Sequence, residues 1–263
     1  MLNIKQYAKV SDLEEAYELN QNRANVILGG MLWLKMQDRN VNTAIDLSGL
    51  GLDQVEETPD QFRIGAMVTL RQLETHTGLL EYSHGAIKEA LRHIVGVQFR
   101  NMATVGGSIF GRYGFSDVLT VFMAMGALVK LYKGGEVSLE KFAAMKYDRD
   151  ILEYVIIPKQ PVKISYMSIR NTKTDFPVIT CCSAYDGAVY RTVIGARPGR
   201  AICFTDEKNI LSDGISEASA KVFAEYVAEN VTTESNNRAS AKYRRKMAGV
   251  LTKRTLLQIG GQS

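Results

Sequence analysis

The sequence predicts an α+β fold in which two small α/β lobes precede a C-terminal α+β domain. Short apolar runs alternate with helix-like segments as far as Pro158 and Pro161, and a meander of strands then leads to two final helices. A second, softer boundary lies near Gly51–Pro59. We therefore expect three domains, at 1–55, 56–160 and 161–263.

The first lobe is predicted to begin with an amphipathic helix over 11–19. Ser11 would be its N-cap, and Glu14, three residues on, would complete a capping box. A short buried strand over 25–28 ends at Gly29-Gly30, and helical spacing resumes over 31–37. A strand over 44–47 completes this lobe.

The second lobe alternates short strands and helices. The pattern predicts a helix that Thr69 caps and an amphipathic helix over 85–95, with Ile87 and Leu91 on its apolar face. The turn at 133–135 between two apolar runs is typical of a hairpin. The strands expected in this lobe are 62–66, 127–132, 136–139 and 151–157.

The C-terminal domain begins with strands over 163–170 and 178–185, and Asp186-Gly187 then predicts a hairpin turn. Helices over 216–229 and 240–259 end the chain. The last helix carries an apolar side and a set of basic residues, which form either a solvated face or a surface for an acidic partner. The apolar side is Tyr243, Met247, Val250 and Leu257, and the basic set is Arg244, Arg245, Lys246, Lys253 and Arg254.

Composition places the chain among ordinary globular proteins. Of its 263 residues, 46% are hydrophobic and 23% are charged, and the net charge of +4 includes no dense basic patch with interleaved aromatics, so we expect no nucleic-acid partner. The apolar runs are too short for a membrane span, and the N-terminus has no hydrophobic signal region. We expect a cytoplasmic protein.

The cysteines and histidines do not suggest a metal site. Cys181, Cys182 and Cys203 lack CxxC spacing, and Cys181-Cys182 lie in an apolar strand-like run, so we expect buried free thiols. Iron–sulfur clusters need four well-spaced thiolates, which this chain does not offer. None of the three histidines belongs to a nucleophile–base arrangement.

The most informative stretch is Ala103–Asp117, which contains glycines at 106, 107, 111 and 114. Glycine lets a ligand approach the backbone, and successive main-chain amides in such a loop can converge on a phosphate. Ser116 is a plausible N-cap for the apolar helix that follows, so the loop leads to a helix N-terminus. Asp117 either serves that helix end or holds sugar hydroxyls of a bound nucleotide.

A second glycine turn strengthens this interpretation. Gly29-Gly30 come directly after a predicted strand and before a predicted helix, so their amides would also lie at a helix start. Each turn alone is also consistent with ordinary turn chemistry. Together they predict two backbone loops that hold one diphosphate.

These two stretches resemble the FAD-binding subunits of the molybdenum hydroxylases, the family of xanthine dehydrogenase and aerobic carbon monoxide dehydrogenase. Leu28-Gly29-Gly30-Met31-Leu32 is similar to the family's first loop. The run from Asn101 to Ile109 and the later Ser116-Asp117-Val118 are similar to its second loop, and the Arg-rich end of the chain is similar to its C-terminal helix. The resemblance covers essentially the whole chain.

The resemblance implies a PCMH-type FAD-binding fold of two lobes, followed by a C-terminal α+β domain, with non-covalent FAD. The backbones of 26–33 and 104–108 would hold the pyrophosphate, Asp117 would hold ribityl or ribose hydroxyls, and Ile94 would pack on the flavin. The implied site residues are Val26, Ile27, Leu28, Gly29, Gly30, Met31, Leu32, Trp33, Ile94, Thr104, Val105, Gly106, Gly107, Ser108, Asp117, Ile151 and Leu152.

The chain also departs from the family pattern. Met31-Leu32 stand where Thr or Ser followed by Asp is usual, so a hydroxyl contact to phosphate is lost and the backbone must hold the phosphate. Where some members carry a lysine, this chain has Pro177 or Val178, which removes a charge near the flavin. The loops contain no His or Cys for a covalent flavin bond.

The function that the resemblance implies is electron transfer. Partner subunits would carry [2Fe-2S] clusters and molybdopterin, and FAD would pass electrons to NAD or another acceptor. No catalytic acid or base is required of this chain. The alternatives are a stand-alone FAD oxidoreductase, which would need an acid that the sequence does not offer, and an assembly subunit without flavin, which Met31-Leu32 favours.

Overall fold

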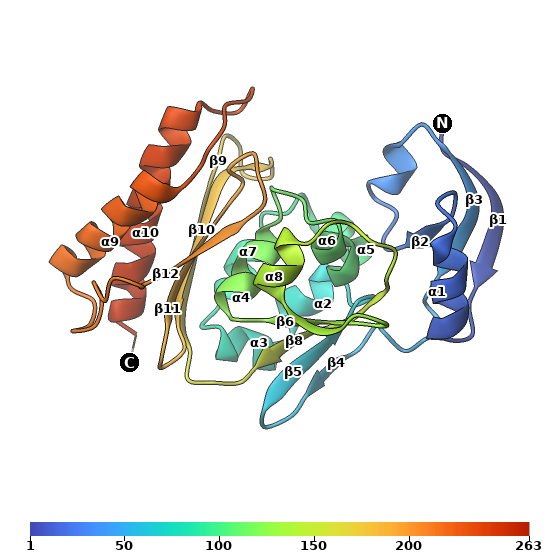
Figure 1. The fold of residues 1–263 in the computed structure, drawn as a ribbon, viewed down its shortest axis with the longest axis horizontal. Coiled ribbons are helices and arrows are strands. Elements are labelled where there is room, and N and C mark those ends of the chain that lie inside the picture. The colour runs from blue at the N-terminus through green and yellow to red at the C-terminus, as the bar shows by residue number, and fades with distance from the viewer. Residues whose placement is uncertain (263) are drawn as a thin grey trace.

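The computed structural model describes residues 1–262, which form three β-sheets in a row with helices between and outside them (Figure 1). The first sheet belongs to the N-terminal part, the second to the central part and the third to the C-terminal part of the chain. The predicted α+β fold is thus present. The predicted domain boundaries after residues 55 and 160 stay predictions.

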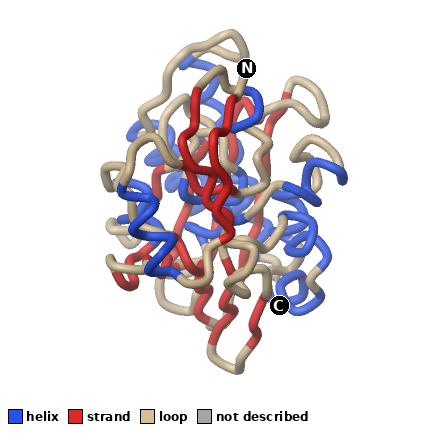
Figure 2. The backbone as a smooth tube through the Cα atoms, turned by 90° about the vertical axis from the view of Figure 1, so that its right-hand side faces the viewer, coloured by secondary structure: helices blue, strands red, loops and turns tan. Residues whose placement is uncertain are grey.

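The N-terminal sheet has three strands in the order β1-β3-β2, and both pairs are parallel. A parallel pair needs a crossover, and α1 (Leu13–Gln21) forms the one between β1 and β2. Figure 2 shows these strands at the front of the molecule. Their bounds are β1 (Asn3–Lys9), β2 (Val26–Leu28) and β3 (Asn40–Asp46), with the single-turn 3₁₀ helix η1 (Leu34–Met36) between β2 and β3.

The central sheet has five antiparallel strands in the order β4-β5-β8-β6-β7. The strand β8 comes last in the sequence but pairs between β5 and β6, so it ties the beginning of this part to its end. The bounds are β4 (Val55–Glu57), β5 (Gln61–Gly65), β6 (Leu128–Leu131), β7 (Gly135–Ser138) and β8 (Leu152–Pro158).

Seven short helices accompany the central sheet. Thr69 caps the first through the predicted side-chain contact, as part of a capping box with Gln72. The helices are α2 (Leu70–Thr75), α3 (Thr77–Tyr82), α4 (Ala86–Leu91), α5 (Val97–Met102), α6 (Val105–Phe110), α7 (Asp117–Ala124) and α8 (Leu139–Ala144).

The C-terminal sheet is an antiparallel meander in the order β12-β11-β10-β9, and the helices α9 and α10 cover its outer face (Figure 1). The predicted hairpin at Asp186-Gly187 joins β10 to β11, with Gly187 at φ 92°. The bounds are β9 (Lys163–Arg170), β10 (Pro177–Tyr185), β11 (Tyr190–Gly195), β12 (Ile202–Thr205), α9 (Glu217–Asn230) and α10 (Ala241–Gly260).

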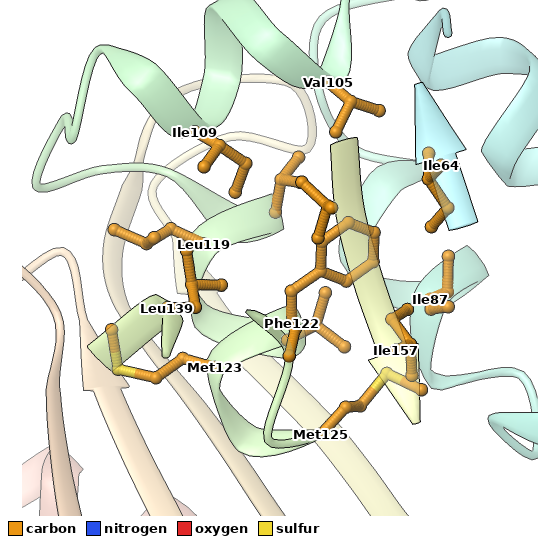
Figure 3. Close-up of a cluster of buried hydrophobic side chains, with 14 of the residues drawn as sticks. Ile64, Ile87, Val105, Ile109, Leu119, Phe122, Met123, Met125, Leu139 and Ile157 are labelled. Atoms are coloured by element: carbon orange, nitrogen blue, oxygen red, sulfur yellow. The ribbon is translucent and has the colours of Figure 1, made fainter. Parts of the chain in front are cut away.

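The largest apolar core lies around α7, every residue of which is buried (Figure 3). Phe122 packs there with Ile64 and Ile157 of the central sheet and Ile87 of α4. The inner face of the C-terminal sheet joins the same core, whereas its outer face forms a second core with α9 and α10. These shared cores hold the central and C-terminal parts against each other.

The structure corrects four sequence-based expectations about single elements. The first helix begins one residue later, because Asp12 rather than Ser11 accepts the capping hydrogen bond, from the Glu15 amide. The segment 31–37 contains only η1 instead of a full helix. The strand over 25–28 is half-buried, and the helix over 85–95 ends at Leu91.

The glycine stretch is also more regular than expected. Gly106 and Gly107 lie inside the short helix α6, which Thr104 caps, and only residues 111–116 form a loop. The prediction that Ser116 caps the following helix is confirmed, since its hydroxyl accepts from the Leu119 amide at 3.1 Å. The site therefore contains two helix starts in succession.

The buried face of α10 differs from the predicted one. Tyr243 is exposed, whereas Arg244, expected among the solvated basic residues, has only 1% of its surface exposed. Its guanidinium donates to the carbonyls of Val178, Glu234 and Ala239 at 2.7–2.8 Å. A buried cation with this many acceptors holds the segment before α10 in place.

Within residues 1–262, no helix combines the length and the apolar content that crossing a bilayer requires.

Candidate functional site

The two glycine turns lie in direct contact, although 77 positions separate Gly30 from Gly107 in the numbering. A Cβ added to Gly29 would stand 2.9 Å from Thr104 Oγ1 and 3.7 Å from Gly107 Cα. A Cβ on Gly30 would stand 1.8 Å from the Met102 carbonyl oxygen, which is closer than any real contact. Glycine is therefore required at position 30 for the N-terminal and central parts to meet.

In the second glycine segment, 104–108, the main-chain amides from Val105 to Ser108 are already used within the protein. Those of Val105 and Gly106 donate to the carbonyls of Val68 and Ala66, at 2.8 and 2.7 Å. The Gly107 amide donates to Thr104 Oγ1 at 3.1 Å, and the Ser108 amide donates to the Thr104 carbonyl at 3.1 Å. This segment offers a ligand its small surface more than its hydrogen-bond donors.

The first glycine segment, 28–33, has the opposite character. Met31 takes φ 58°, a left-handed conformation that is uncommon for a residue with a side chain. Across the described chain, the amides of Gly30, Met31, Leu32 and Trp33 meet no protein acceptor. Unpaired amides beside a cavity can bind an anion.

Two cavities meet at the contact between the glycine segments. The first, the aromatic cavity, has a volume of about 340 Å³ and contains Trp33, Phe99, Phe115 and Phe176 in its wall. The second, the polar cavity, has a volume of about 400 Å³ and is lined partly by asparagines, arginines and aspartates from three segments. The residues that line both cavities are Val26, Ile27, Gly29, Arg39, Thr104, Gly107 and Tyr113.

The aromatic cavity is built from side chains of distant segments. The Trp33 ring stacks on Phe176 with centroids 5.6 Å apart, and Phe115 meets Phe176 edge-on at 4.6 Å. Trp33 also approaches Phe99 at 6.2 Å. Such a wall favours a flat, largely apolar ligand ring.

Asp117 lies in the wall of the aromatic cavity but is not free. Its carboxylate pairs with Arg170 and accepts a hydrogen bond from the Tyr166 hydroxyl, and only 4% of the residue is exposed. Burial raises the pKa of Asp117, whereas the Arg170 guanidinium and the Tyr166 hydroxyl lower it. Burial and the nearby carboxylate raise the pKa of Tyr166, which therefore stays a donor. The network fixes the direction of the carboxylate.

Ile94 lines the aromatic cavity as predicted, and a buried ion pair holds its backbone. Arg100 donates to the Ile94 carbonyl at 3.0 Å and forms two hydrogen bonds with Glu74, at 2.9 and 3.1 Å. The next residue, Val95, takes φ 49°, which is a strained conformation for a β-branched side chain. His93 also lines this cavity, and burial lowers its pKa, so the imidazole is neutral near pH 7.

Nearly all predicted site residues line one of the two cavities, or both. The aromatic cavity receives Gly30, Met31, Leu32, Trp33, Ile94, Ser108 and Asp117, and the polar cavity receives Leu28, Gly106, Ile151 and Leu152. Val26, Ile27, Gly29, Thr104 and Gly107 line both. Val105 is the exception, because its side chain is fully buried in the central core.

Sequence reasoning missed several side chains of this site. Phe115 and Phe176 form much of the aromatic wall, Arg170 pairs with Asp117, and Arg39 lies where the cavities meet. Phe115 lies inside the glycine stretch, so an aromatic ring beside the ligand could have been predicted from its position there. The others come from distant segments that carry no motif.

The thiols are buried as predicted for Cys181 and Cys182. Burial raises the pKa of Cys181 to about 11 and that of Cys203 to about 12, so they stay protonated near pH 7. Residues 1–262 contain no group of three or more His, Cys, Asp or Glu side chains that could hold a metal ion.

A model of the family described as the FAD binding domain in molybdopterin dehydrogenase matches residues 2–160. The chain belongs to this family. FAD is therefore its cofactor, and the chain is part of an oxidoreductase. The match spans the N-terminal and central sheets and so includes both glycine segments and the whole lining of the polar cavity, whereas the aromatic cavity also takes wall residues from 170–177, beyond the match.

Curated relatives extend the likeness over nearly the whole chain. The sequence is 23% identical to the nicotine 6-hydroxylase medium subunit of Paenarthrobacter nicotinovorans, over 98% of each chain. It is 23% identical to the glyceraldehyde dehydrogenase medium chain of Sulfolobus acidocaldarius, over 96% of this chain and 97% of that one. It is 28% identical to the uncharacterized protein YgfM of Escherichia coli K12, over 94% and 93% of the two chains.

Solved structures share the fold of the whole chain. A chain of the Cu,Mo-containing CO dehydrogenase superposes with a TM-score of 0.87 over 100% of both chains, at 19% identity. A chain of quinoline 2-oxidoreductase from Pseudomonas putida 86 superposes with a TM-score of 0.83 over 99% of this chain and 97% of that one, at 18% identity. The expected fold, including the C-terminal domain, is thus confirmed.

Proposed function

We propose that this protein is the FAD-carrying medium subunit of a multi-subunit molybdenum hydroxylase. The single observation that carries the proposal is the direct contact of the two glycine segments at the junction of two cavities. FAD is a long molecule with a diphosphate at its middle and an aromatic ring system at each end. A pair of cavities that meet at a glycine-lined junction fits that division.

The residues suggest how each part is held. The flavin ring would occupy the aromatic cavity, beside Ile94, and the adenine would occupy the polar cavity, near Ile151 and Leu152. The diphosphate would lie at the junction, where the free amides from Gly30 to Trp33 donate hydrogen bonds. Asp117, held in direction by Arg170 and Tyr166, would accept from ribityl hydroxyls.

When bound, FAD supplies the electron-carrying chemistry, from iron–sulfur clusters of a partner subunit to NAD⁺ or another acceptor. The protein's residues orient the cofactor and exclude water from one side of it, and no side chain of the site is needed as an acid or base. The medium-subunit names of two relatives support the presence of partner subunits, and we propose that these partners carry the iron–sulfur and molybdopterin groups. We also propose that the complex is cytoplasmic.

Purification of the chain alone tests the proposal. We expect a yellow protein with flavin absorbance, about one FAD for each chain, and no oxidation of an organic substrate in the absence of partners. A colourless protein that also fails to take up added FAD would instead be an assembly subunit. Turnover of an organic substrate by the isolated chain would show a stand-alone oxidoreductase.

The native complex provides the second test. We expect two further chains to co-purify with the medium subunit, one that contains iron and sulfide and one that contains molybdenum. Adding NAD⁺ to the reduced complex and following the absorbance of NADH then tests the proposed acceptor. Absence of iron and molybdenum from every co-purified chain would contradict the partner assignment.

A further inference from the structure

The junction between the two cavities contains a single charged side chain among the residues that line both of them. That residue is Arg39, which precedes β3 and belongs to the N-terminal part. The other shared residues are apolar, small or uncharged polar ones. The junction is where both glycine segments meet, so a group that spans the cavities must pass beside Arg39.

Arg39 has no acidic partner within the part of the chain that the structure describes. Its guanidinium has one distant contact, with Gln37 Oε1 at 3.5 Å, and the side chain is exposed. The adjacent Asp38 pairs with the N-terminal amine instead. In the polar cavity, Asp150 accepts the amides of Lys133 and Gly134. Arg39 is thus a cation that is free to bind an anion.

Other arginines reinforce the positive potential on this side of the junction. Arg23 and Arg149 line the polar cavity as well. Burial lowers the pKa of Arg149, and the charges of Arg23 and Arg39 lower it further, so both of these cations lie near the Arg149 guanidinium. Arg149 is committed to the carbonyls of Asn22 and Asn25, at 3.0 and 3.1 Å, whereas Arg39 lines both cavities and has no such commitment.

The need for such a cation follows from what the glycine segments lack. Met31 and Leu32 have no hydroxyl, and the amides of Val105 to Ser108 donate to protein acceptors. Only the short run of free amides in the first segment remains for a group that carries two negative charges. A guanidinium can donate two parallel hydrogen bonds to phosphate oxygens and neutralise part of that charge.

We propose that Arg39 binds the diphosphate of FAD and replaces the side-chain hydroxyl that the first glycine segment lacks. This inference rests on the proposed function, because it needs FAD at the junction. It assigns a role in cofactor binding to a residue outside both glycine motifs. It also assigns to the N-terminal part the charge that attracts the cofactor.

The test compares FAD binding to apoprotein for the wild type, Arg39→Gln, Arg39→Lys and the control Lys35→Gln. Lys35 is an exposed cation of the same segment and lines neither cavity. The quenching of FAD fluorescence gives the Kd, at ionic strengths from about 0.01 M to about 1 M, over which the Debye length falls from about 30 Å to about 3 Å. Circular dichroism checks that each variant is folded.

We expect Arg39→Gln to raise the Kd about tenfold at low salt, equivalent to about 1.4 kcal/mol. Its Kd should also respond less to salt than that of the wild type, because the screened charge is gone. Arg39→Lys should recover part of the affinity and most of the salt response, and Lys35→Gln should match the wild type.

The outcomes separate this inference from the function on which it rests. Failure of wild-type apoprotein to bind FAD would contradict the proposed function itself. If the wild type binds FAD and Arg39→Gln binds it equally well, only the role of Arg39 is wrong. A raised Kd of Arg39→Gln with an unchanged salt response would also contradict a direct contact between Arg39 and the diphosphate, since the residue would then act through local structure.

Discussion

The two glycine segments have different structural roles, although each places two glycines beside a cavity. In the second, from Thr104 to Ser108, the amides from Val105 onward are bound to protein acceptors, so the segment is a wall fixed by its own hydrogen bonds. In the first, from Gly30 to Trp33, the amides are free and close packing against Met102 fixes the backbone. Glycine removes side-chain bulk in one segment and allows a close backbone contact in the other.

The difference shows that a motif does not fix the role of its atoms. Both segments were expected to bind the pyrophosphate through main-chain amides, but only the first has amides to offer. The second contributes space, because Gly107 leaves the junction open. A substitution in either segment therefore has a different expected consequence.

The largest change in stability is expected at the buried Glu74–Arg100 ion pair, which holds the helix before the second segment. Glu74→Gln leaves the Arg100 guanidinium buried without its charge partner, and both side chains are 5% exposed. We expect the free energy of unfolding to fall by about 3 kcal/mol, as measured by urea denaturation. Glu56→Gln, which removes an exposed pair with Arg63, should change it by less than about 0.5 kcal/mol. Equal effects would contradict the importance of this anchor.

The same pair gives a pH dependence with a defined sign. Burial alone raises the pKa of Glu74, but hydrogen bonds and charge from Arg100 and Arg71 outweigh it and hold the pKa below its ordinary value. The stabilisation is therefore complete above the unfolded-state pKa of about 4.3 and is lost as the pH falls through the lower folded-state pKa. Glu74→Gln should flatten the acid limb of the stability curve.

The next effect tests the close packing of the first segment. In Gly30→Ala the new Cβ would overlap the Met102 carbonyl oxygen, so the backbones of the two segments must separate. We expect a loss of about 2 kcal/mol in stability, together with weaker FAD binding. In the control Gly261→Ala, the Cβ meets no atom closer than 3.7 Å. Wild-type stability of Gly30→Ala would show that the segments do not need this contact.

The third prediction tests the space that the second segment leaves. Gly107→Val should raise the Kd for FAD at least about tenfold, because a branched side chain would fill the junction. The fold should persist, since the nearest atom to the new Cβ is Thr104 Oγ1 at 3.2 Å and the backbone is helical. Gly107→Ala should have a smaller effect. Unchanged FAD occupancy in the valine variant would place the cofactor elsewhere.

The smallest effect tests the hydrogen bonds of the second segment. Thr104→Ala removes the cap that accepts from the Gly107 amide, so stability should fall by about 1 kcal/mol. Thr104→Ser keeps an acceptor and should retain most of that stability. Thermal unfolding of the apoproteins makes the comparison without the cofactor. Identical melting temperatures for all three would mean that the cap does not fix the wall.

The general arrangement of the site could be predicted from the sequence, because it depends on short-range patterns such as caps, turns and strand ends. The strand before Gly29, the cap at Ser116 and the hairpins depend on neighbouring residues, and each lies where it was expected. The use of the amides could not be predicted, because their acceptors lie at Ala66 and Val68, at the end of a distant strand. These contacts also explain why two glycines remain helical against their intrinsic preference.

The burial and pairing of charged side chains could not be predicted from the sequence either. Arginine is usually a surface residue, yet Arg244 donates to a carbonyl of the strand β10 and to a carbonyl of the loop before α10. The pairing of Asp117 with Arg170 joins residues 53 positions apart. Neither contact leaves a periodic signal in the sequence, because each depends on how the sheets and helices meet.

The position of the junction between the N-terminal and central parts of the chain has a thermodynamic consequence. Gly29 belongs to the N-terminal part and Gly107 to the central part, so one bound molecule would touch both at once. Each tenfold rise in free ligand above its Kd would add about 1.4 kcal/mol against separation of the two parts. The cellular supply of flavin would then set how long the newly made chain survives proteolysis.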